Sequence, residues 1–288
     1  MYLYMNGMYV KKEEAVISPF DHGFLYGMGL FETFRTYNGH PFLLDDHIER
    51  LHRGFQELNI SHSIKKETIL SILNELQVRN QLRDAYVRLN VSAGVGDIGL
   101  RSSAYDNPTI IVFQKEPPSL PSSEKEGKIL NLKRNTPETR FRLKSHHYFN
   151  NMAAKRELGV SPDGEGIFLT EHRYVAEGIT SNIFWYKGGK LYTPSVETGI
   201  LNGITRQFIL SISSRLEINV EEGLYSVDEL LKADEIFVTN SIQEIVPLNK
   251  LCDEKFPGRK GKVFQLLSNY YKKKTEKLWS RHEIGGKI

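Results

Sequence analysis

The chain alternates between stretches with strand-like and helix-like spacing of apolar residues. Between Ala85 and Ala93 every second residue is apolar, and Tyr86, Arg88 and Asn90 occupy the positions between. This period of two predicts a strand with one buried face and one polar face. Thr109–Gln114, rich in β-branched residues, predicts a second strand.

Turns and amphipathic segments surround these strands. Asn6-Gly7 separates the apolar runs 2–5 and 8–10 and predicts a tight hairpin, and Asn38-Gly39 predicts another turn. Two helices are predicted where apolar residues recur every three or four positions: Ile48, Leu51, Phe55 and Leu58, then Ile69, Leu70, Ile72, Leu73 and Leu76.

A polar segment divides the chain. Residues 116–127, EPPSLPSSEKEG, are rich in proline, serine and charge and have almost nothing to bury, so we interpret them as a linker. The second half then alternates predicted strands (166–170, 174–176, 180–186, 235–239 and 242–247) with predicted helices (148–158, 205–213, 226–232 and 261–277). The expected organisation is two α+β domains, a smaller one over 1–115 and a larger one over 128–288.

Composition narrows the class of protein. The 288 residues include 38 Lys and Arg against 35 Asp and Glu, a net charge of +3 without a long basic run, so nucleic-acid binding is not expected. Cys252 is the one cysteine, which excludes an internal disulfide and argues against a thiolate metal site. No apolar run approaches a membrane span, and the N-terminus lacks the pattern of a signal peptide. A cytoplasmic protein is expected.

Three segments have the composition of a reactive site. LNGITRQF places Gly203 before a predicted helix, where the amides of Ile204 and Thr205 would be free to bind a phosphate. Glu177 ends a predicted strand and is either a surface turn residue or a fixed anion facing a cofactor. Lys144 precedes a helix; it is either solvated or the amine of a Schiff base, which burial and nearby positive groups would favour. His146 and His147 lack the spacing of helical metal ligands, and no metal is expected.

These segments occur in the order found in class IV aminotransferases, a family of pyridoxal-phosphate enzymes, and the chain resembles that family over nearly its whole length. DHGFLYGMGLFET resembles the family's N-terminal Gly-rich segment, HIERL its His-x-x-Arg-Leu helix, and AEGITSN its Glu-Gly-x-x-Ser-Asn motif. LNGITR and EIFVTNSIQEIVP resemble its phosphate-binding helix start and its last motif. The resemblance implies the two-domain α+β architecture of fold-type IV pyridoxal-phosphate enzymes, as in the D-amino acid aminotransferases.

The resemblance also implies roles for individual residues. Lys144 would carry pyridoxal 5'-phosphate as a Schiff base and act as general base, and Glu177 would hold the proton on the pyridine nitrogen. The remaining cofactor-binding residues would be Arg50, Asn182, Ile204, Thr205, Asn240 and Ser241. Substrate-binding residues would be Phe31, Tyr86, Arg88 and Tyr148. A homodimer is also implied, with active sites that borrow partner residues, Phe31 being a candidate.

Within the family, SPFDHGFLYGMGLFETFR and LLDDHIERL most resemble the aminodeoxychorismate lyases, whose small-molecule substrate would lose pyruvate to give 4-aminobenzoate for folate synthesis. The alternative is a branched-chain aminotransferase, because Tyr86 and Arg88 match that group's Tyr-x-Arg. A D-amino acid aminotransferase fits less well, since the Arg-x-His pair expected near VSAGVGDIG is absent. A family member that binds the cofactor without turnover is the non-enzymatic alternative.

Overall fold

The computed structural model describes residues 1–119 and 124–285, which form two compact units. Unit 1 comprises Met1–Pro118, Leu143–His147 and Thr275–Ser280; unit 2 comprises Ser119–Arg142, Tyr148–Lys274 and the residues from Arg281 on. Residues 120–123 of the expected linker lie outside the described part of the chain. The chain therefore returns twice to unit 1 after first leaving it.

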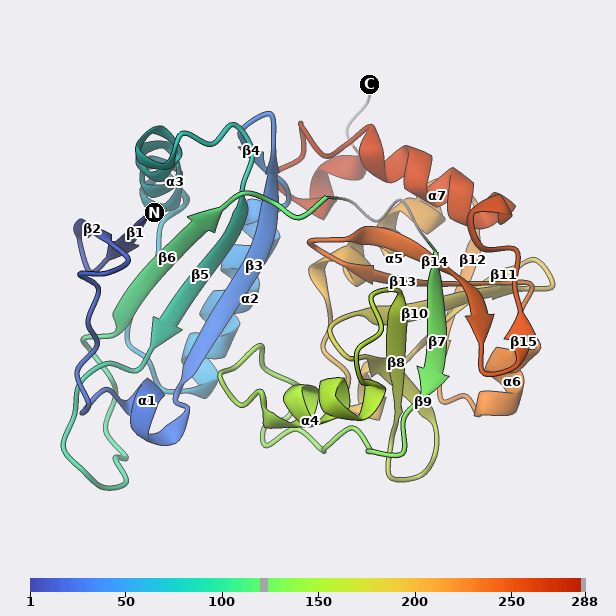
Figure 1. Cartoon of the computed structure of the whole chain (residues 1–288), viewed down its shortest axis with the longest axis horizontal. Coiled ribbons are helices and arrows are strands. Elements are labelled where there is room, and N and C mark those ends of the chain that lie inside the picture. The colour runs from blue at the N-terminus through green and yellow to red at the C-terminus, as the bar shows by residue number, and fades with distance from the viewer. Residues whose placement is uncertain (120–123, 286–288) are drawn as a thin grey trace. The chain divides into compact units, whose positions relative to one another are not determined.

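Unit 1 is an antiparallel sheet with two helices against one face (Figure 1). The strand order is β2-β1-β6-β5-β3-β4. Its strands are β1 (Tyr2–Met5), β2 (Met8–Lys11), β3 (Gly29–Tyr37), β4 (His40–Pro41), β5 (Tyr86–Ser92) and β6 (Thr109–Lys115). Its helices are α1 (His22–Tyr26), α2 (Leu44–Glu57) and α3 (Lys66–Asn80).

The sequence predictions for unit 1 are largely confirmed. Asn6 and Gly7 both have positive φ, 46° and 92°, and join β1 to β2 as a tight antiparallel hairpin. Along β5, Val87, Leu89 and Val91 are buried in the core formed with α2 and α3, and the residues between them point to the opposite face. The sheet therefore has a helix-covered face and a face turned away from α2 and α3.

Unit 2 is a mixed nine-stranded sheet with the path β12-β11-β10-β13-β14-β7-β8-β9, to which β15 adds by pairing with β14. Its strands are β7 (Lys125–Ile129), β8 (Gly164–Leu169), β9 (Val175–Gly178), β10 (Asn182–Lys187), β11 (Lys190–Pro194), β12 (Asn219–Gly223), β13 (Glu235–Asn240), β14 (Glu244–Leu251) and β15 (Glu254–Lys255). Its helices are α4 (Phe149–Leu158), α5 (Ile204–Arg215), α6 (Val227–Leu231) and α7 (Lys262–Lys272), with 3₁₀ turns η1 (Val196–Thr198), η2 (Gly258–Lys260) and η3 (Arg281–Gly285).

Several elements differ from the sequence predictions. Strand β3 lies in the Gly-rich segment, to which no element was assigned. Strand β7 begins at Lys125, within the expected linker. Strand β14 begins at Glu244 because Asn240 Oδ1 accepts the amides of Ile242 and Gln243, which form a turn instead of a strand. Helix α7 ends at Lys272, and the next segment belongs to unit 1.

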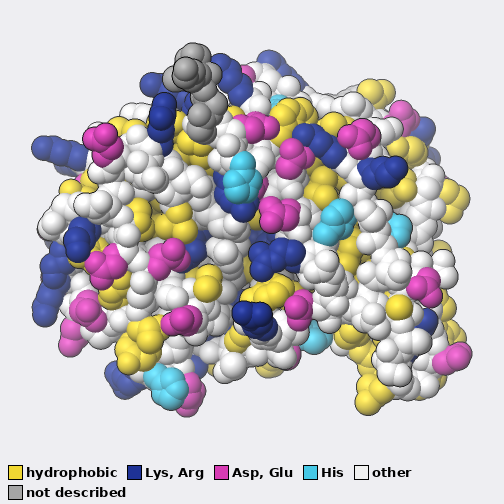
Figure 2. Space-filling view, turned by 180° about the vertical axis from the view of Figure 1, so that it is seen from behind, with side chains coloured by type: hydrophobic (Ala, Val, Ile, Leu, Met, Phe, Trp, Pro, Cys, Tyr) yellow, Lys and Arg dark blue, Asp and Glu magenta, His cyan; other side chains and the backbone are white. Residues whose placement is uncertain are grey.

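The surface mixes charges of both signs. Figure 2 shows Lys and Arg side chains interspersed with Asp and Glu over the face that it draws. Among the residues that the structure describes, no helix is both long and apolar enough to cross a membrane.

Candidate active site

The Lys144 segment is attached to unit 1 as a short extension of its sheet. Phe31 N donates to Lys144 O at 2.9 Å, and His146 N donates to Gly29 O at 2.9 Å, so residues 144–146 run antiparallel to the start of β3. The Lys144 ammonium nitrogen lies 4.5 Å from the centre of the Phe31 ring. Main-chain pairing with β3 therefore fixes the backbone of Lys144.

Phe31 brings a second cation close to the same place. The Arg88 guanidinium carbon lies 3.7 Å from the Phe31 ring centre, on the face turned away from α2 and α3. Arg88 donates to Asn90 Oδ1 at 3.2 Å, and 3.1 Å separates that oxygen from His146 Nε2. Lys144, Phe31 and Arg88 thus form one group within unit 1, and Tyr86, two residues from Arg88, shares their face.

His146 is an uncharged member of this group at neutral pH. Burial, with the nearby Arg88 cation, lowers the pKa of His146 to about 4. Gly29 is required beneath it, because a Cβ there would come within 2.3 Å of the imidazole. The sequence analysis considered His146 only as a metal ligand; its spacing of two from Lys144 was the available signal.

Arg50 belongs to a buried ion-pair cluster on the helix-covered face. Its Nε and one terminal nitrogen donate to the two oxygens of Glu32, at 2.8 and 2.6 Å, and His47 Nδ1 donates to Glu32 at 2.7 Å. Burial alone would raise the pKa of Glu32, but Arg50 and His47 outweigh burial and lower it to about 2. Burial also lowers the pKa of His47, against the opposing effect of Glu32. Glu32 and His47 were not predicted, although His47 and Arg50 are spaced to share one helix face.

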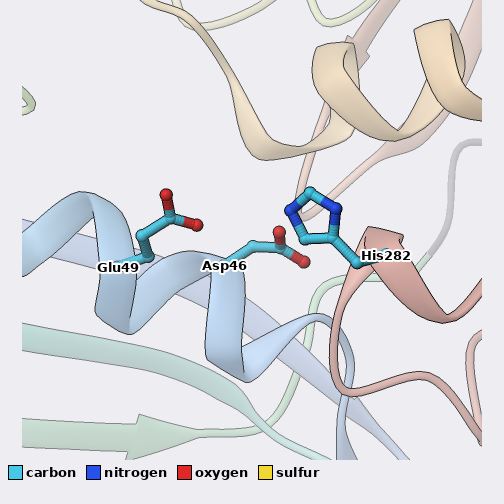
Figure 3. Close-up of side chains that lie close together, drawn as sticks. All are labelled: Asp46, Glu49 and His282. Carbon is cyan, nitrogen blue, oxygen red and sulfur yellow. The ribbon is translucent and has the colours of Figure 1, made fainter.

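Asp46 and Glu49 lie close to this cluster in sequence, on neighbouring turns of α2 (Figure 3). Asp46 is buried and accepts a hydrogen bond from Ser280, whereas Glu49 is exposed. His282, also labelled in Figure 3, belongs to η3 of unit 2, so the three residues carry no argument for a metal site.

Glu177 ends β9 in unit 2, and its side chain is held at both oxygens. Arg134 Nε donates to Oε1 at 2.8 Å, and the amide of Leu201 donates to Oε2 at 3.1 Å. Arg142 Nε lies 3.8 Å from Oε1. Burial lowers the pKa of Arg142 to about 10, and Arg134 adds to the lowering. Glu177 is only 4% exposed, so the interpretation of this residue as a surface turn residue is wrong.

The start of α5 has the features of an anion-binding site. No described side chain caps it, because the N-cap is Gly203, so its first amides have no partner within the helix. Thr205 Oγ1 lies 3.3 Å from Ser241 Oγ, which brings two hydroxyl groups from separate motifs together. Both the helix start and the pairing of Thr205 with Ser241 agree with the positions predicted for a phosphate site.

Asn182 and Asn240 act on loops beside this helix start. Asn182 Nδ2 donates to Leu201 O at 2.8 Å, and a Cβ at Gly203 would lie 2.2 Å from Asn182 Oδ1, so glycine is needed there. Asn240 holds the turn after β13. Tyr148 is the half-buried N-cap residue of α4. Lys144 and Arg50 lie in unit 1, whereas Glu177, Thr205 and Ser241 lie in unit 2.

Comparisons with known proteins assign the family. Residues 29–251 match the family Amino-transferase class IV. The chain is 50% identical over 289 residues to the aminodeoxychorismate lyase of Bacillus subtilis (strain 168), covering 99% of this chain and 98% of the relative. It is 37% identical over 275 residues to a putative branched-chain-amino-acid aminotransferase of Methanocaldococcus jannaschii, covering 94% and 96%.

A solved structure agrees with these relatives. The branched-chain amino acid aminotransferase of T.th., in complex with N-(5'-phosphopyridoxyl)-L-glutamate, has a TM-score of 0.84 and 26% identity, covering 96% of this chain and 94% of that one. Both the predicted α+β fold and the predicted family are confirmed, and this chain belongs to the class IV aminotransferases.

Proposed function

We propose that this chain is an aminodeoxychorismate lyase that uses pyridoxal 5'-phosphate. The carrying observation is its identity to the Bacillus subtilis lyase over nearly the full length of both chains. In the proposed reaction the substrate loses the proton at its amine-bearing carbon, and the ether bond to the enolpyruvyl group breaks. The ring becomes aromatic as 4-aminobenzoate, and the released enolpyruvate takes up a proton at its methylene carbon to become pyruvate.

The residues of unit 2 fit the phosphate end of the cofactor. The free amides of Ile204 and Thr205 and the adjacent hydroxyls of Thr205 and Ser241 are donors suited to a dianion at a helix start. Arg50 of unit 1 is proposed as a further phosphate ligand; Glu32 would fix the direction of its guanidinium. Asn182 and Asn240 would support the loops that carry these donors.

Glu177 and Lys144 fit the reactive end. When bound, the cofactor supplies an aldehyde that joins to amines and a ring that withdraws electrons from the amine-bearing carbon. Glu177, buried and held at both oxygens, would keep the proton on the ring nitrogen. The Lys144 amine would hold the cofactor and, once the substrate amine has displaced it, remove the proton from the amine-bearing carbon. The same amine would then deliver a proton to the departing enolpyruvate.

The face of unit 1 around Phe31 fits the substrate. Arg88 supplies a planar cation that can bind a carboxylate with two hydrogen bonds, and the substrate carries two carboxylates. Tyr86 and Phe31 share that face. Tyr148, at the start of α4, is proposed as a further active-site residue.

One comparison tests this function against its alternatives. Purified protein is incubated with 4-amino-4-deoxychorismate, with and without 2-oxoglutarate, and pyruvate and 4-aminobenzoate are measured. A lyase releases both products without the acceptor. A requirement for 2-oxoglutarate would indicate an aminotransferase instead, for which the matching residues Tyr86 and Arg88 are the supporting observation. Cofactor binding without either reaction would indicate a non-catalytic protein.

A homodimer in the cytoplasm completes the proposal. Exposed apolar side chains gather on two adjoining loops of unit 1, which are joined by the hydrogen bond from Gly96 N to Phe20 O: Val16, Ile17, Phe20, Phe24, Val95, Ile98 and Leu100. Such a surface suits contact with a second copy. Light scattering should report a dimer for the wild type and for Val160→Glu, an exposed site on unit 2, and a monomer for Ile98→Glu. The exposed free thiol of Cys252 fits a reducing compartment.

A further inference from the structure

The loop before α4 places a buried guanidinium between two elements of unit 2. Arg134 Nε donates to Glu177 Oε1 at 2.8 Å, and its NH1 donates to Asn150 Oδ1 at 2.7 Å. The Arg134 side chain is only 7% exposed. One planar group therefore joins the end of β9 to the first turn of α4.

Asn150 is itself held in the orientation that this contact needs. Its Nδ2 donates to Lys133 O at 3.0 Å, so the amide oxygen faces Arg134. Asn151 Oδ1 lies 3.4 Å from the same Arg134 nitrogen, and Asn151 Nδ2 donates to Ile179 O. These contacts explain why two asparagines stand in the first turn of α4, where the family resemblance suggested more apolar residues.

The consequence for Glu177 is a fixed carboxylate plane. Arg134 occupies one oxygen and the Leu201 amide occupies the other, so rotation of the carboxylate would break both hydrogen bonds. The lone pairs left over then keep one direction before any ligand arrives, which is the preorganisation that electrostatic sites depend on. We infer that Arg134 is a positioning residue that aims Glu177 at the cofactor ring nitrogen, and that Asn150 holds Arg134 in place.

Charge and geometry can be separated because a second cation is present. Arg142 stays 3.8 Å from Glu177 when Arg134 is changed, so the carboxylate keeps a positive neighbour. Lysine at position 134 would keep the charge but lose the planar fork that reaches Glu177 and Asn150 together. A role in positioning therefore predicts that lysine restores only part of the function.

The inference rests on the proposed function and is tested by binding instead of turnover. The affinity of the apo-protein is measured for pyridoxal 5'-phosphate and for its carba analogue, in which a CH group replaces the ring nitrogen. We expect Arg134→Gln to weaken binding of pyridoxal 5'-phosphate roughly tenfold and binding of the analogue less than twofold. Arg134→Lys should fall between wild type and Arg134→Gln, and Asn150→Leu should lose about threefold for the natural cofactor alone. Arg156→Gln, an exposed residue of α4, is the matched control.

The outcomes distinguish the two levels of the proposal. Equal losses for both ligands, no loss, or a wild-type phenotype for Arg134→Lys would overturn the positioning role. A greater preference for the natural cofactor in Arg134→Gln would also overturn it, because Arg134 would then only weaken the charge of Glu177. If wild type binds both ligands equally, the proposed contact between Glu177 and the ring nitrogen fails first. Asn150→Leu keeps the test decisive should Arg134→Gln not fold.

Discussion

Each unit buries a carboxylate against arginine, but the partners come from different kinds of structure. Glu32 of unit 1 lies on a strand covered by α2, and both partners, His47 and Arg50, come from that helix. Glu177 of unit 2 is held by Arg134 and by the Leu201 amide, both in loops. The first cluster is part of the packing between helix and sheet. The second lies where the chain can change without loss of the core, as expected of a site that serves chemistry.

The largest expected effect separates the two carboxylates by stability. Glu32→Gln leaves the buried partners Arg50 and His47 without their counter-charge and should lower the free energy of unfolding by about 3–5 kcal/mol. Glu75→Gln, which breaks an exposed pair with Arg79, should cost about 0.5 kcal/mol or less. Urea unfolding of the apo-proteins measures both. Equal stability of Glu32→Gln and wild type would contradict the structural role of this cluster.

A second prediction compares the proposed phosphate ligands of the two units. Thr205→Val should weaken binding of pyridoxal 5'-phosphate roughly tenfold through the loss of one hydrogen bond to a charged group, and leave stability nearly unchanged. Arg50→Lys should weaken binding and stability together, because Arg50 also holds Glu32. Ser211→Ala, elsewhere on α5, is the control. A loss of stability alone in Arg50→Lys would remove it from the phosphate site.

A smaller effect concerns the pH dependence of stability. The folded pKa of His146, about 4, lies below its ordinary value of 6.5, so between these values the unfolded chain binds the proton and the folded chain does not. Stability should therefore fall as pH drops from 6.5 to 4, by about 1–2 kcal/mol from this residue after allowance for partial exposure. His146→Asn should flatten that slope, whereas His172→Asn, which is exposed, should not. The Glu32 contribution is lost lower, between pH 4.5 and 2.

The contrast between the units also explains what could be predicted from sequence. The alternation of β5 and the Asn-Gly turns are local signals, and both were confirmed. Strand β3 shows no alternation because almost all of its positions are buried, so its pattern does not distinguish it. The uncapped start of α5 was predicted because Gly203 and Thr205 adjoin in sequence. Arg134 was not, because 43 residues separate it from Glu177 and neither lies on a periodic face.

The attachment of Lys144 is the central claim, and borohydride reduction of the purified holoenzyme tests it most directly. Reduction fixes any imine as a stable amine, and peptide mass spectrometry then locates the phosphopyridoxyl group. The account predicts one modified residue, Lys144, and no label in Lys144→Ala, with Lys155→Ala labelled as wild type. A label on another lysine, or none on protein that releases pyruvate from its substrate, would contradict it.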